Sequence, residues 1–134
     1  MTQKSEIGVF GENLACEYLK NNGYHVLERN FQKPWGELDI IAKHKDGTLV
    51  FVEVKTMTEG AELKPEDQLT QSKLKKLRRT ASMYAGVNEE LIKDSKGWRL
   101  DLIAIDIPKN VNIYSLTDIK KGVENYKIRH WENV

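Results

Sequence analysis

The segment from Gly36 to Lys55 constrains the fold most, because two apolar runs joined by a short turn carry charges inside them. The first run, 37–43, contains Asp39, and the second, 49–55, contains Glu53 and Lys55. Apolar runs on either side of an Asp-Gly turn are typical of a β-hairpin. A charge buried there without a partner would cost on the order of several kcal/mol. The three charges therefore indicate either a functional site or an ion pair.

The length of the turn decides whether the two carboxylates share one face of the sheet. A two-residue loop at 46–47 would pair Asp39 with Val54 and put Asp39 and Glu53 on opposite faces. A three-residue loop at 45–47, with its glycine in the left-handed conformation, would place Asp39 directly opposite Glu53. We predict the three-residue loop or another loop of the same parity.

Two opposed carboxylates would bind Mg²⁺ or Mn²⁺, since these hard cations prefer oxygen ligands, and the backbone carbonyl of Val54 offers a further ligand. A divalent ion activates water for attack on a phosphodiester. Lys55 follows Glu53 by two residues, on the same strand face, where it would orient that water or stabilise developing charge. The alternative is a structural hairpin in which Asp39 or Glu53 forms an ion pair with Lys55.

The rest of the chain alternates between predicted helices and strands. Helical spacing of apolar residues predicts two helices, at 5–22 and 68–86. Further strands are predicted at 24–31, 98–107 and 111–116, and the second of these is apolar on both faces, as central strands are. The polar stretch 56–67 is predicted to be a loop, and the segment from residue 117 is left unassigned. This order predicts an α/β fold in which helices flank a central mixed sheet of four to five strands.

Length and composition agree with one soluble domain over residues 1–134. No apolar run reaches the roughly 18 residues that a membrane span needs. The N-terminus has no export leader, and Cys16 is the single cysteine, so we expect a cytoplasmic protein without an internal disulfide. The three histidines show no zinc-site spacing. Asp101, beside Arg99, is predicted to form a structural ion pair.

The net charge of the chain is only +1, but residues 68–86 carry five cations and no acid. Four of these cations are predicted to contact nucleic-acid phosphates: Lys73, Lys76, Arg78 and Arg79. A charged run on a helix is also commonly just a solvated face, and that alternative stays open. Lys73 stands out because its neighbour one helical turn later, Leu77, is apolar.

Several segments together resemble a known family. They lie at 11–15, 27–31, 36–42, 50–55, 98–101 and 128–133. On these segments the chain resembles the YraN-like family of small bacterial proteins. That family is similar to archaeal Holliday-junction resolvases and belongs to the PD-(D/E)xK nuclease-like superfamily. The resemblance implies a restriction-endonuclease-like, resolvase-like core.

The resemblance also implies functional roles. Asp39, Glu53 and Lys55 take the metal-binding and catalytic positions, and Glu12 takes the place of an acidic residue on the first helix. The helical wheel alone puts Glu12 and Glu17 at opposite borders of the apolar stripe and does not choose between them. The implied activity is Mg²⁺-dependent endonuclease cleavage of branched or structured DNA, with a homodimer as the working assembly. The alternatives are a nucleic-acid-binding protein that keeps the fold without cutting, and a protein-interaction subunit.

Overall fold

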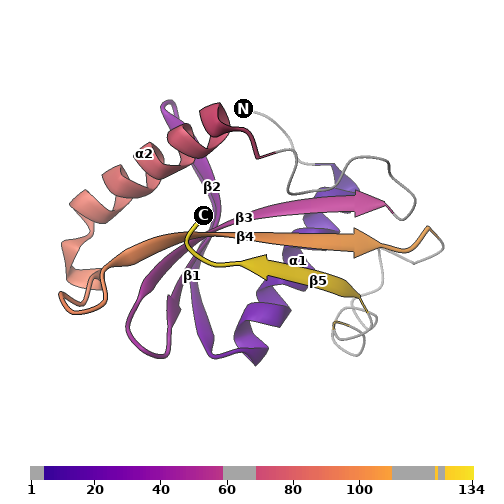
Figure 1. Ribbon diagram of the computed structural model, residues 1–134, viewed down its shortest axis with the longest axis horizontal. Coiled ribbons are helices and arrows are strands. Elements are labelled where there is room, and N and C mark those ends of the chain that lie inside the picture. The colour runs from indigo at the N-terminus through magenta and orange to yellow at the C-terminus, as the bar shows by residue number, and fades with distance from the viewer. Residues whose placement is uncertain (1–4, 59–68, 110–122, 124–125) are drawn as a thin grey trace.

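A five-stranded mixed sheet with one long helix on each face forms the protein (Figure 1). The computed structural model describes residues 5–58, 69–109, 123 and 126–134. In chain order its elements are α1 (Glu6–Asn21), β1 (Tyr24–Lys33), β2 (Gly36–His44), β3 (Leu49–Thr58), α2 (Gln71–Val87), the 3₁₀ helix η2 (Glu89–Leu91), β4 (Trp98–Ile107) and β5 (Lys127–Trp131). Within the described ranges, no helix has the length and apolar character needed to cross a membrane.

The strands lie in the order β1-β2-β3-β4-β5, and every neighbouring pair is antiparallel except β3 and β4, which are parallel. The predicted mixed sheet with a helix on each face is therefore confirmed. The chain crosses over through α2, because parallel neighbours need a long connection.

Two strand predictions need correction. The structure extends β3 to Thr58, so residues 56–58 belong to a strand that pairs with β4 and not to a loop. The last strand described is β5, in the segment that the sequence left unassigned. The strand predicted at 111–116 and the remainder of the predicted loop, 59–67, lie outside the described residues.

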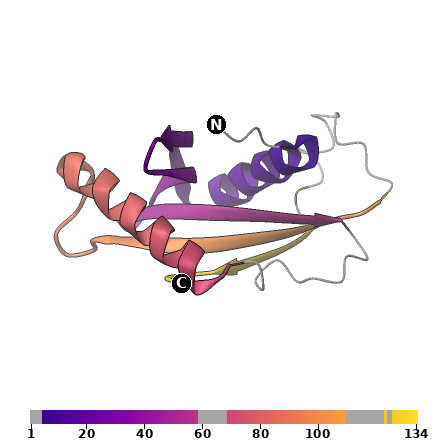
Figure 2. The same cartoon turned by 90° about the horizontal axis from the view of Figure 1, so that it is seen from above.

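Separate apolar layers cover the two faces of the sheet, one beneath α1 and one beneath α2. Figure 2 shows the sheet from above, with the two helices beside it. The α1-side core combines helix residues with strand residues: Phe10, Leu14, Leu19, Ile40, Val50, Val52, Ile103 and Ile105. The α2-side core is built in the same way from Ile41, Leu49, Phe51, Ala81, Tyr84, Ala85 and Leu100. Because β3 and β4 contribute to both layers, their sequences are apolar at successive positions.

Two glycines allow the helices to approach the sheet closely. A Cβ on Gly11 of α1 would clash with the side chain of Thr56 on β3. A Cβ on Gly36, at the start of β2, would clash with Thr80 of α2. These contacts anchor both helices beside the segment that carries the candidate site.

Candidate active site

The β2–β3 turn has the predicted three-residue form. The backbone N–H of His44 donates to the carbonyl of Thr48 at 2.9 Å, and Gly47 lies in the left-handed region at φ +100°. The ladder then runs from Lys43 opposite Leu49 to Ile40 opposite Val52. The next position in this register places Asp39 opposite Glu53, so the length of the loop is the one that the predicted site requires.

The β2–β3 ladder stops at Ile40, and the side chain of Asp39 replaces its next backbone acceptor. Alternate pairs of an antiparallel ladder exchange hydrogen bonds, so Val54 would continue the series with Leu38. The Val54 N–H instead donates to Oδ2 of Asp39 at 2.8 Å. The N–H and C=O of one strand residue point to the same side, so the carbonyl of Val54 also faces β2. Asp39 and this carbonyl are therefore brought to the same gap between the strands.

The backbone of β2 is irregular at Asp39. Leu38 packs in the α2-side core and Ile40 in the α1-side core, although strict alternation would put both on one face. Asn30 on β1 lies opposite Asp39 in the β1–β2 register and has a left-handed backbone with φ 54°. Asparagine tolerates this conformation better than most residues. The carboxylate of Asp39 reaches β3, where it accepts the hydrogen bond from the N–H of Val54.

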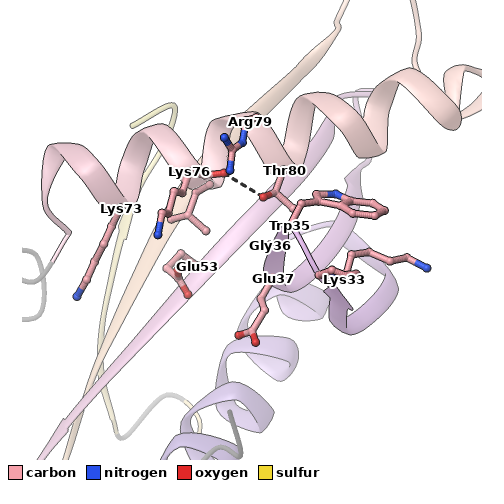
Figure 3. Close-up of a pocket in the computed structure, with 11 residues that line it drawn as sticks. Lys33, Trp35, Gly36, Glu37, Glu53, Lys73, Lys76, Arg79 and Thr80 are labelled. Atoms are coloured by element: carbon pink, nitrogen blue, oxygen red, sulfur yellow. Dashed lines mark hydrogen bonds between the residues drawn. The ribbon is translucent and has the colours of Figure 1, made fainter. Parts of the chain in front are cut away.

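Glu53 lies on the α2 side of the sheet and lines an open cavity of about 710 Å³. Its neighbour two residues back, Phe51, belongs to the α2-side core, and Lys55 follows on the same face by strand alternation. Figure 3 shows Glu53 beneath α2, with the side chain of Lys76 above it and that of Lys73 to its left. The predicted carboxylate and the predicted basic helix are thus brought together.

Cations dominate the side chains around this cavity. The lining residues come from β3, α2 and the β1–β2 turn: Lys33, Pro34, Trp35, Gly36, Glu37, Glu53, Lys73, Lys76, Leu77, Arg79 and Thr80. Four cations therefore face two carboxylates. An open cavity with this excess of positive charge attracts phosphate groups.

Not every predicted basic residue reaches the cavity. Lys73, Lys76 and Arg79 line it, whereas Arg78 donates to the backbone oxygen of Val134. Arg78 therefore ties α2 to the segment after β5, and its predicted role in phosphate binding has no support from the cavity.

Burial distinguishes the two glutamates of α1. Glu12 is 1% exposed, and its Oε1 lies 3.3 Å from Nε of Arg29. The side chain of Glu17 is 30% exposed and lies 3.9 Å from the ammonium of Lys20. The structure thus identifies Glu12 as the buried acid, which the helical wheel could not do. Glu12 belongs to α1, which packs on the face of the sheet opposite to the one on which Glu53 lies.

A second polar cluster joins α1, β4, β5 and the residues after β5. Asp101 is fully buried and accepts hydrogen bonds from Nε of Arg99 at 2.9 Å and from the N–H of Asn133 at 3.0 Å. Nε2 of His130 lies 2.7 Å from its other oxygen, and the hydroxyl of Tyr18 lies 3.0 Å from Nδ1 of the same ring. The predicted ion pair of Asp101 with Arg99 is confirmed.

The same cluster brings ligand atoms of Asp101, His130 and Glu132 within 4.8 Å of one another. The Arg99 guanidinium also bonds both Asp101 oxygens and Glu132, so a protein cation already occupies this centre. Burial alone would raise the pKa of Asp101, but the hydrogen bonds from His130, Arg99 and Asn133 outweigh it and hold the pKa below its usual value. The cluster is therefore a structural ion-pair network.

Sequence reasoning missed the contribution of the β1–β2 turn. No function was predicted for residues 34–36, but the turn and the start of β2 supply one wall of the cavity, including Trp35 and Glu37. A tryptophan directly after a proline in a tight turn is a detectable signal, because a turn keeps such a side chain near solvent.

Comparison with known proteins adds a family relationship. Residues 11–105 match the model of a family described as "Uncharacterised protein family UPF0102". The chain is 38% identical over 119 residues to a UPF0102 protein of Clostridium botulinum strain Loch Maree, covering 89% of this chain and 94% of that protein. It is also 38% identical over 128 residues to a UPF0102 protein of Alkaliphilus oremlandii, covering 96% of each.

Proposed function

The chain belongs to the UPF0102, or YraN, family, and from its site we propose a Mg²⁺- or Mn²⁺-dependent endonuclease that hydrolyses phosphodiester bonds in structured or branched DNA. One observation carries this proposal. The carboxylate of Asp39 takes the place of a backbone acceptor at Val54, in the register opposite Glu53.

The donor set fits a hard divalent cation. Asp39, Glu53 and the carbonyl of Val54 supply only oxygen atoms, and these atoms suit Mg²⁺ and Mn²⁺ better than softer metals. Bound there, the ion would lower the pKa of an attacking water and neutralise charge at phosphorus. Glu12, a buried carboxylate on α1, is proposed to support the ion from the α1 side of the sheet.

The remaining residues act on the substrate. Water adds to phosphorus as the bond to the leaving oxygen breaks, so the protein needs no covalent intermediate. Lys55, on the strand face of Glu53, orients the water or stabilises the charge that develops on the phosphoryl oxygens. Lys73, Lys76 and Arg79 line the same cavity and neutralise phosphates of the bound strand.

The test is a cleavage assay on branched, single-stranded and duplex DNA, with Mn²⁺ and with EDTA. We expect Mn²⁺-dependent cleavage that Asp39→Asn reduces about 100-fold or more, because the amide keeps an acceptor for Val54 but loses the negative charge. Glu89→Ala, an exposed carboxylate on η2, is the matched control and should keep full activity. Equal cleavage by the Asp39 variant and the wild type would contradict the proposal.

A second candidate is a nucleic-acid-binding protein that keeps this fold without cutting. The cations of the cavity favour it, because phosphate binding by lysine and arginine needs no metal. Calorimetry separates the two. Mn²⁺ binding that Asp39→Asn removes supports the nuclease, whereas DNA binding without any Mn²⁺ binding supports the second candidate.

A further inference from the structure

Trp35 is the exposed aromatic side chain of the described part of the chain. It is 43% exposed, and the other large apolar side chains exposed there are aliphatic: Val9, Leu27, Met83 and Val87. The tryptophans of β4 and β5 are only partly exposed, and Trp98 packs edge-on against Phe51. A single exposed apolar side chain is common on protein surfaces, so the informative feature of Trp35 is its position at the cavity.

The turn holds Trp35 firmly. Lys33 pairs with Gly36, so Pro34 and Trp35 are the two central residues of a tight β-turn. The ring of Pro34 fixes its own φ, and Gly36 packs directly against Thr80 of α2. The backbone that carries the indole is therefore fixed before a ligand binds, which limits the conformational entropy lost on binding.

The surroundings of Trp35 select its ligand. Figure 3 shows the indole at one end of the labelled side chains and Lys73 at the other, with Lys76 and Glu53 between them. A flat apolar ring at the end of a row of cations matches a nucleotide strand, whose phosphates contact the cations while a base stacks on the ring. An apolar protein partner would bring nothing to neutralise these cations.

We propose that Trp35 is a stacking platform for an unpaired base of the bound DNA strand, adjacent to the nucleotide whose phosphate reaches Glu53. Resting on the proposed nuclease function, this assigns the substrate class: DNA with splayed or single-stranded nucleotides at the cleavage position. A base inside a duplex is stacked on both faces and cannot offer one to the indole. Trp35 therefore discriminates a branch or a single-stranded arm from continuous duplex.

The test measures binding without cleavage. Wild-type protein in EDTA is titrated into a labelled splayed-arm duplex, whose junction sets the position at which the protein binds the strand. The titration is repeated with versions of this DNA that each lack one base, at successive unpaired positions. We expect removal of one particular base to weaken binding about 10-fold. Trp35→Ala should weaken binding to the intact arm by a similar factor and should not respond to the missing base. Trp35→Phe should keep most of the affinity for the intact arm and most of the loss of affinity when that base is removed.

Val87→Ala is the matched surface control, because Val87 is 80% exposed on α2 and lies outside the cavity. A Trp35→Ala variant that binds intact and abasic arms with the same ratio as wild type would overturn the stacking proposal. Mn²⁺-dependent cleavage of the same arms tests the nuclease separately. If binding depended on one base but no DNA were cut, the nuclease proposal would be wrong and the stacking proposal would stand. If the DNA were cut equally well whichever base was missing, the stacking proposal would be wrong and the nuclease proposal would stand.

Discussion

Asp39 acts first as a structural acceptor, and this gives its carboxylate a defined position. A free aspartate on a strand samples several rotamers, but the hydrogen bond from Val54 selects one that lies along the sheet. The left-handed backbone of Asn30, opposite Asp39 on β1, belongs to the same distortion. Departures from regular strand geometry such as these concentrate at functional sites.

Glu12 provides a test at the level of one residue. Glu12→Gln should change the free energy of unfolding by less than about 1 kcal/mol, because Arg29 is partly exposed and the neutral amide is easier to bury. If Glu12 supports the divalent ion, the same substitution should lower Mn²⁺-dependent cleavage about 10-fold or more. Urea unfolding and a Mn²⁺ titration of cleavage measure the two effects.

Glu17→Gln is the control for this prediction, since Glu17 lies on the same helix with a partly exposed side chain. It should change neither stability nor cleavage. Full cleavage activity in Glu12→Gln would assign Glu12 a structural role only.

The residues of the hairpin were predictable, whereas the choice between Glu12 and Glu17 was not. Parity around Gly47 is a local property, because the turn sets the register of both strands. The burial of Glu12 depends on how α1 lies over the sheet, which follows from contacts such as Gly11 with Thr56. A helical wheel contains no information on that placement.

At the level of elements, β5 depends on long-range contacts for its position. It is five residues long and contains Lys127, Arg129 and His130, so its own sequence gives a weak strand signal. It pairs with β4, and His130 reaches the buried Asp101. Because that bond joins residues distant in sequence, no local pattern could have predicted the strand. The longer strands β2, β3 and β4 were predicted because each carries an apolar run of its own.

Asp101→Asn should destabilise the protein by about 3 kcal/mol at pH 7, because Arg99 and His130 would lose the buried charge that they contact. The folded pKa of Asp101 is depressed, so its contribution is present above the unfolded pKa of about 4 and is lost as pH falls through the folded value. The difference between variant and wild type should therefore shrink below about pH 4. Urea unfolding of both proteins between about pH 3 and pH 7 measures this stability difference, because a carboxyl with an ordinary pKa titrates within that range.

Comparing the two proteins at each pH cancels the contributions of ionisable groups that do not interact with Asp101. Asp94→Asn, an exposed carboxylate before β4, controls for the loss of one negative charge and should leave stability nearly unchanged. If the difference in unfolding free energy between Asp101→Asn and wild type stayed constant down to the lowest pH, Asp101 would not be ionised in the folded protein.

For the whole molecule, charge distribution matters more than net charge. The chain carries only +1 in total, yet Lys33 and three cations of α2 line the same cavity as Glu53. A bound strand would be drawn to this face and would bring its phosphates toward the opposed carboxylates. The basic run at 68–86 was visible in the sequence, but the separation of its members into cavity-lining and outward-facing residues required the fold.

Lys75 and Lys76 allow the effect of cations gathered at the cavity to be separated from the effect of net charge. They are adjacent and both exposed on α2, but only Lys76 lines the cavity. Lys76→Ala should weaken DNA binding about 5-fold at low salt, uniformly across sequences, and should reduce the slope of log affinity against log salt by about 1. Lys75→Ala removes the same charge from the same helix and should have a much smaller effect. Fluorescence anisotropy over a range of salt concentrations measures both, and equal losses in the two variants would indicate attraction by the general charge of α2 rather than binding in the cavity.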